Sequence, residues 1–65
     1  MAVVNMKEYY AYYTIVGVRF LFSPMTSSYA PDPGNAELRM LIETQRKYPG
    51  KEIIIGKVRQ YGSSN

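Results

Sequence analysis

One run of residues limits what this chain can fold into more than any other feature. Residues 9–22 read YYAYYTIVGVRFLF, dominated by tyrosine, phenylalanine and β-branched side chains, which favour a β-strand. A straight strand of this length would span about 45 Å, whereas a domain of 65 residues has a diameter of roughly 28 Å. We therefore predict a strand over residues 8–22 that either bends at Gly17 or projects to pair with a second chain.

The two alternating sets of side chains in this strand predict which face meets the core. One set is uncharged, and we expect it to face the core. Its members are Tyr10, Tyr12, Thr14, Val16, Val18, Phe20 and Phe22. The other set, from Tyr9 to Leu21, is more mixed and includes Arg19. A helical start over residues 6–13 remains an alternative, because Asn5 could cap it and apolar side chains recur there at helical spacing.

A stretch rich in proline and small polar residues follows the strand. Residues 23–35 read SPMTSSYAPDPGN, which predicts a long loop. Loops of this length are commonly functional or mobile. Its large apolar side chains are those of Met25 and Tyr29. These two side chains either hold the loop against the core or remain available to a ligand.

Residues 36–48 carry the clearest helical pattern of the chain. Side chains that recur at helical spacing form one stripe, which we expect to pack on the sheet. The stripe consists of Leu38, Leu41, Ile42, Gln45 and Tyr48. Either Asn35 caps this helix, or Asp32 caps it with Pro33 at the first helical position. A Pro-Gly dipeptide then ends the helix.

The last predicted strand covers residues 52–61 and precedes a short tail, residues 62–65. The strand opens on three consecutive isoleucines, a pattern typical of a strand that is covered on both faces. Gly56 predicts a β-bulge within it.

These elements predict a small α+β domain of β-α-β order, with one helix packed on one face of the sheet. If the two strands are neighbours and parallel, the crossover between them is right-handed. Two strands also leave unpaired edges, which a second copy of the chain would cover by extending the sheet. One helix leaves the other sheet face open, and that face is expected to display nine side chains. They are Tyr9, Tyr13, Ile15, Arg19, Ile53, Ile55, Lys57, Arg59 and Tyr61.

The chain contains neither cysteine nor histidine. Disulfides, zinc sites of the usual Cys/His type and hydrolase triads are thereby excluded, and we expect no cofactor and no metal. A domain of this size rarely gains more than about 3–5 kcal/mol from its own core. Because other common stabilising devices are missing, we expect a homodimer. The lack of cysteine also fits a reducing compartment, and we predict a cytoplasmic protein.

Positive charge is concentrated at the carboxyl-terminal end. Residues 1–45 contain three cationic and four acidic side chains, a sum of −1, whereas residues 46–65 contain five cationic and one acidic, a sum of +4. The net charge of the whole chain is +3. That end can attract an acidic protein, a nucleic acid or a nucleotide. The uncharged aromatic run of residues 9–18 is too short to span a membrane, so no membrane partner is expected.

The function expected from these features is non-catalytic binding of a protein partner. The order of elements is similar to that of small phage-encoded proteins that bind and inhibit a host enzyme, a likeness of size and order without a shared motif. The alternative is binding of single-stranded nucleic acid or a nucleotide, in which bases stack on tyrosines and cations follow phosphates. A small metal-independent ribonuclease that uses Tyr61 is the third hypothesis. The residues expected to contact a partner or nucleic acid are Tyr9, Tyr13, Arg19, Tyr29, Lys57, Arg59 and Tyr61.

Overall fold

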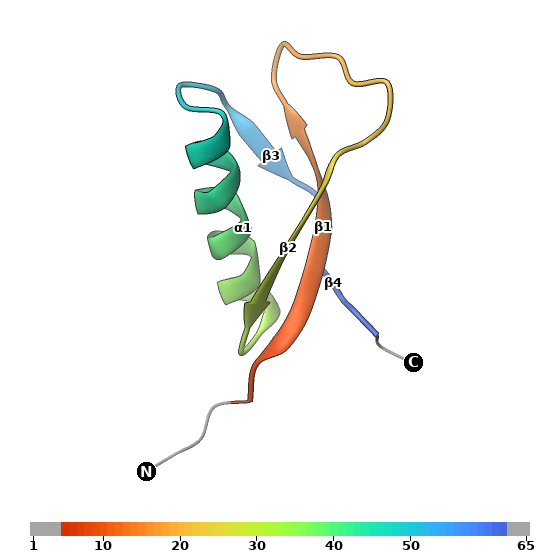
Figure 1. Cartoon of the computed structure of the whole chain (residues 1–65), viewed down its shortest axis with the longest axis vertical. Helices are drawn as coiled ribbons and strands as arrows, with labels where there is room; N and C mark the ends of the chain where they lie inside the picture. The colour runs from red at the N-terminus through yellow and green to blue at the C-terminus, as the bar shows by residue number, and fades with distance from the viewer. Residues whose placement is uncertain (1–4, 63–65) are drawn as a thin grey trace.

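The sheet is built around its first strand. The computed structural model describes residues 5–62 and contains, in chain order, β1 (Lys7–Ile15), β2 (Met25–Ala30), α1 (Pro33–Lys47), β3 (Ile53–Ile55) and β4 (Arg59–Gln60). β2 pairs with one edge of β1, and β3 and β4 pair with successive parts of the other edge. These pairings are antiparallel, and α1 packs across one face of the sheet (Figure 1). The prediction of a small α+β fold is confirmed for this part of the chain.

The prediction of a loop over residues 23–35 is wrong, because this stretch contains β2. The strand runs antiparallel to β1, with Ala30 beside Lys7 and Met25 beside Tyr12. β2 combines the strand formers Thr26 and Tyr29 with two serines and an alanine, so its own side chains favour a strand only weakly and its pairing with β1 stabilises it. The predicted β-α-β order therefore gains a strand before the helix, and the pairings of β1 with β2, β3 and β4 are antiparallel, so no parallel crossover occurs among them.

β1 ends at Ile15, well short of its predicted end. The chain turns at Gly17, whose φ of +85° is a conformation that L side chains rarely adopt, and the Val18 N–H donates to the Ile15 carbonyl at 3.0 Å. The predicted bend is confirmed at this glycine, but the strand stops there, and residues 16–24 form the loop to β2. The alternative of a helical start is wrong, because the backbone is extended from Lys7 onward.

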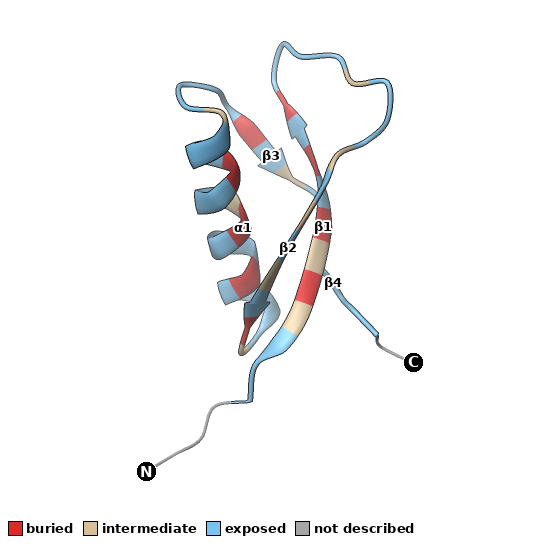
Figure 2. Cartoon of the chain, viewed as in Figure 1, coloured by how far each residue is buried: buried red, intermediate tan, exposed pale blue. Residues whose placement is uncertain are grey.

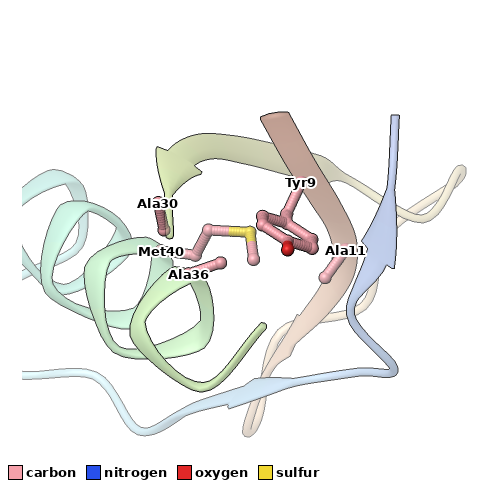
Figure 3. Packing of buried hydrophobic residues seen from close by; sticks show 5 residues of the cluster. All are labelled: Tyr9, Ala11, Ala30, Ala36 and Met40. Atoms are coloured by element: carbon pink, nitrogen blue, oxygen red, sulfur yellow. The ribbon is translucent and has the colours of Figure 1, made fainter. Parts of the chain in front are cut away.

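The face of β1 that meets the helix is the opposite of the predicted one. The buried residues of β1 are Tyr9, Ala11, Tyr13 and Ile15. Five members of the uncharged set predicted to face the core are exposed: Tyr12, Thr14, Val16, Val18 and Phe22. Ala11 packs in a cluster with two further alanines, from β2 and α1, and with Met40 (Figure 3). Small residues let the helix lie close to the sheet. This close packing determines which face of β1 is buried, even though the side chains of the other face are uncharged.

The start of α1 confirms the second of the two predicted caps, Asp32 with Pro33 at the first helical position. The two carboxylate oxygens of Asp32 accept from Asn35: Oδ1 from the backbone N–H at 2.8 Å and Oδ2 from the side-chain amide at 2.9 Å. These hydrogen bonds stabilise the charged carboxylate and lower the pKa of Asp32 below its usual value. The helix ends at Lys47, just before the Pro-Gly dipeptide.

α1 packs on the sheet through small and flexible side chains rather than through the predicted stripe. Its buried residues are Ala36, Met40 and Thr44. The Thr44 hydroxyl is satisfied inside the core, because it donates to the Met40 carbonyl at 2.8 Å. Leu41 and Tyr48 of the predicted stripe are partly buried against the sheet. The prediction is wrong for the other three members, which are exposed: Leu38, Ile42 and Gln45.

The predicted last strand is divided into β3 and β4 by a β-bulge. Ile55 lies opposite Tyr13, and Arg59 lies opposite Tyr10, so β1 advances three residues where the other strand advances four. The extra residue changes the alternation of side chains. As a result both Ile55 and Val58 pack against the cluster of buried residues beneath the sheet.

Gly56 begins this bulge, as its position in the sequence predicts. Its N–H donates to the Tyr12 carbonyl at 2.8 Å, and a Cβ at Gly56 would lie 2.9 Å from the same oxygen. Only glycine allows this approach without a displacement of β1. Of the predicted tail, residues 63–65 lie outside the described part of the chain.

Candidate functional site

The sheet face opposite α1 is open (Figures 1 and 2). Strand alternation and the pairing register determine which side chains it carries. The even-numbered residues of β1, which alternate with its buried residues, lie on this face, and so do the residues of β2 that pair with them. β3 and β4 each contribute one residue, and Tyr61, just after β4, contributes another. We call this surface the outer face. Its members are Glu8, Tyr10, Tyr12, Thr14, Met25, Ser27, Tyr29, Ile54, Arg59 and Tyr61.

Three tyrosines form a cluster on the outer face. The rings of Tyr10 and Tyr61 lie 4.8 Å apart, centroid to centroid, and the rings of Tyr10 and Tyr12 lie edge to face at 6.4 Å. The backbone holds Tyr61 in place, because its N–H donates to the Glu8 carbonyl at 2.7 Å. Arg59 lies opposite Tyr10 in the register, so this arginine borders the tyrosine cluster.

The large apolar side chains of the outer face are accessible to a partner. Tyr12, Tyr29 and Ile54 are each more than half exposed, and Met25 and Tyr61 are exposed as well. A gathering of large apolar side chains on one surface of a small domain marks an interaction site. The two charged residues of the outer face have opposite signs. The outer face is therefore aromatic and close to neutral.

The structure brings together three of the seven predicted contact residues. Tyr29, Arg59 and Tyr61 all lie on the outer face. Arg19 lies in the loop between β1 and β2, and Lys57 lies in the bulge between β3 and β4. Both are exposed, and both lie outside the paired strands that define the outer face.

The prediction that Tyr9 and Tyr13 lie on the open face is wrong. They are 4% and 6% exposed and fill the core between the sheet and α1. Ile15 and Ile53, also expected on the open face, are buried as well. Burial and the neighbouring Tyr48 hydroxyl raise the pKa of Tyr13 above its usual value of 10.0, because both disfavour the phenolate. These side chains belong to the core and do not reach the outer face.

Sequence reasoning missed Tyr10, Tyr12 and Ile54 as surface residues, because it assigned the first two to the core. One signal could have found them. Ala11 is a small residue in a run of bulky ones, and it is fully buried in the cluster that contains Met40 (Figure 3). A small residue on one face of an aromatic strand indicates where a helix packs, and the bulky neighbours then belong to the other face.

The loop between β1 and β2 carries a second exposed apolar site. Leu21 and Phe22 are 91% and 81% exposed, although the sequence predicts a strand there. Phe20 holds the base of the loop, since its ring lies 6.5 Å from the ring of Tyr13. Two bulky apolar side chains in water are suited to contact an apolar pocket of another molecule.

Within residues 5–62, no three His, Cys, Asp or Glu side chains are placed to hold a metal ion, and no helix has the length and apolar character to cross a membrane. Comparison with protein families, with curated proteins and with solved structures finds no match for this chain. The functional interpretation therefore rests on the geometry and chemistry of the outer face.

Proposed function

We propose that this chain is a non-catalytic binding protein that binds a protein partner through its outer face. The observation that carries the proposal is the exposure of Tyr12, Tyr29 and Ile54 on the face that α1 leaves open. Tyrosine and arginine are among the residues that most often dominate binding energy at protein interfaces. Tyrosine also presents a large rigid ring at low entropic cost.

The charge of the outer face favours a protein over a nucleic acid. Its charged residues, Glu8 and Arg59, have opposite signs. A nucleic-acid site needs cations that follow the phosphates. Of the other cations of residues 46–65, Arg46 and Lys47 belong to the last turn of α1, on the far side of the sheet. Lys51 lies between α1 and β3, and Lys57 lies in the bulge between β3 and β4. Binding of nucleic acid by the outer face would therefore contradict this proposal.

The size of the chain suits a role in which it covers a functional surface of its partner and inhibits it, as expected of a protein from a virus or mobile element. We place the interaction in the cytoplasm, an environment that suits a cysteine-free chain. We also infer that the chain self-associates and that a second copy extends the sheet. The basis is β2, a six-residue strand at the edge of the sheet. Unpaired edges of this kind readily accept another strand.

Affinity capture from the source cells tests the binding surface. The full chain is compared with a variant carrying both Tyr12→Ser and Tyr29→Ser and with Leu38→Ser. Leu38 is the matched control, because it is 56% exposed on α1, away from the outer face. We expect the outer-face variant to retain about tenfold less of the captured protein, which corresponds to a loss of about 1.4 kcal/mol. The control should capture as much as the unaltered chain.

Equal capture by the outer-face variant and the control would contradict the proposal. A fluorescent single-stranded oligonucleotide gives a second arm. Binding that falls with salt and is lost in Arg59→Ala would assign the outer face to nucleic acid instead. Cleavage of an RNA oligonucleotide that disappears in Tyr61→Phe would show a ribonuclease.

A further inference from the structure

The free edge of β2 is the longest strand edge left open in the described part of the chain. β2 pairs with β1 on one side only. The Tyr13 N–H donates to the Pro24 carbonyl at 3.0 Å, so the even-numbered residues of this segment direct their backbone groups to β1 in the antiparallel ladder. The N–H and carbonyl groups of Met25, Ser27 and Tyr29 therefore point away from the sheet. One of them, the Tyr29 carbonyl, accepts from the Arg39 side chain at 2.8 Å and from the Ser28 hydroxyl at 3.3 Å, so a pairing strand has to displace Arg39 there.

We propose that a second copy of this chain pairs with this edge, β2 to β2, about a two-fold axis at Ser27. The proposal rests on the proposed function in one respect, since it takes the outer face as the binding surface. In an antiparallel pair the outward-pointing groups of both strands must meet, so odd-numbered residues must oppose odd-numbered residues. A two-fold axis at Ser27 meets this condition and places Met25 opposite Tyr29 of the second copy.

This register is self-complementary on both faces of the sheet. On the outer face, Met25 of each copy meets Tyr29 of the other, and contact between a thioether and an aromatic ring is favourable. Both side chains are exposed in the single chain. On the side that faces the helix, Thr26 meets Ser28 of the other copy, a pair suited to a hydrogen bond across strands. Ser27 faces its own copy at the axis, where a small side chain avoids a clash.

Charged side chains line the groove between β2 and α1: two arginines and one glutamate, with Lys47 beside them. Arg39 lies at the Tyr29 end, where its Nη1 donates to the Tyr29 carbonyl at 2.8 Å. Glu43 lines the groove together with Met25, and Arg46 lies 3.5 Å from it. Because Tyr29 of one copy lies opposite Met25 of the other, Arg39 of one copy, displaced from the Tyr29 carbonyl by the pairing strand, is brought toward Glu43 of the other, which exchanges Arg46 for it. The ion pair forms twice, and each copy supplies both of its halves.

Contact between the two strand edges is too small by itself for a stable dimer. A stable interface buries about 800 Å² on each partner, more than six strand residues provide. The helix side chains that line the groove must therefore be covered as well, and the two-fold axis brings the second copy alongside them. We expect a dimer that dissociates on dilution rather than a permanent one.

This dimer makes the outer face continuous across the two copies. Met25 and Tyr29 lie on the edge strand, so each copy adds its own pair beside that of the other. A partner that contacts Tyr29 of one copy then also contacts Met25 of the second copy. The binding surface of the single chain is incomplete at this edge.

A single cysteine at the axis tests the register, because the chain has none of its own. Ser27→Cys is expected to give a covalent dimer with a short thiol-to-thiol crosslinker, since the opposed Cα atoms would lie about 5.5 Å apart. Ser28→Cys is the matched control, as the next serine of the same strand, and it would face Thr26 of the second copy, away from the axis. Crosslinking of Ser28→Cys in its place, or of neither variant, would overturn the register.

Sedimentation of the unaltered chain at high micromolar concentration tests the dimer itself. We expect a species of twice the chain mass that is lost in Arg39→Glu and in Glu43→Arg. It should return in the variant with both changes, because the ion pair is then reversed. A monomer in the unaltered chain, or a double variant that stays monomeric, overturns the proposal. This measurement needs no partner protein, so its failure is distinguishable from a failure of capture by the outer face.

Discussion

The ring of Tyr61 packs against the ring of Tyr10 at a centroid distance of 4.8 Å, which ties the last strand of the sheet to its centre. The strand just before it, Arg59–Gln60, has two residues, and both are exposed. A backbone hydrogen bond of 2.7 Å from the Tyr61 N–H to the Glu8 carbonyl supports the same attachment. This aromatic pair and the backbone pairing together hold the shortest strand of the sheet against β1.

Replacement of Tyr61 by alanine should loosen β4 from β1. The aromatic pair contributes about 0.5–1.5 kcal/mol beyond the area that it buries, so the free energy of unfolding should fall by about 1 kcal/mol in urea denaturation. Phe22→Ala is the control, because Phe22 is 81% exposed in the loop between β1 and β2. Its effect should stay within about 0.5 kcal/mol. Equal losses in the two variants would show that the Tyr10–Tyr61 pair does not stabilise the sheet.

Gly56→Ala should lower the free energy of unfolding by about 1–3 kcal/mol. The added Cβ would lie 2.9 Å from the Tyr12 carbonyl oxygen, which belongs to the backbone of the central strand and cannot move aside easily. Gly34→Ala is the matched control, because its Cβ would meet the Asp32 carboxylate at 3.4 Å and alanine favours a helix. Chemical denaturation should show the control unchanged or more stable. If both variants behave alike, the bulge does not require glycine.

Met40→Ala and Leu38→Ala distinguish the observed helix face from the predicted one. Met40 is fully buried among small residues, so its truncation should cost about 2–5 kcal/mol. Leu38 is exposed, and its truncation should change stability by no more than about 0.5 kcal/mol. Both values follow from urea denaturation. A larger loss for Leu38→Ala would mean that the helix packs through its predicted stripe.

The stability of the fold should depend on pH through Asp32. Hydrogen bonds from Asn35 lower the pKa of Asp32 below its usual value of 3.8. The carboxylate therefore stabilises the folded state above that usual value, and the contribution is lost as the pH falls through the lower value of the folded state. Asp32→Asn keeps a capping side chain but does not titrate. Melting temperatures of the two proteins should diverge between neutral and acidic pH, with the unaltered chain losing more, and a constant difference would contradict the assignment.

Sequence features with a local structural effect predicted the structure correctly. The Asp32 cap, the turn at Gly17 and the bulge at Gly56 each follow from backbone conformation or from hydrogen bonds between near neighbours. Surface positions on the outer face were harder to predict. Tyr29, Arg59 and Tyr61 were identified, whereas Tyr10 and Tyr12 of β1 were assigned to the core.

The sequence by itself determined the helix, the aromatic strand and the glycines at which the backbone turns or bulges, because these depend on local propensity. Only the tertiary structure decided which face of β1 is buried and that residues 25–30 form a strand. Alternation offers two faces, and the choice depends on small residues from separate elements, Ala11, Ala30 and Ala36, that meet only when the chain folds. β2 likewise forms because β1 provides hydrogen-bond partners for its backbone, which its own side chains do not reveal.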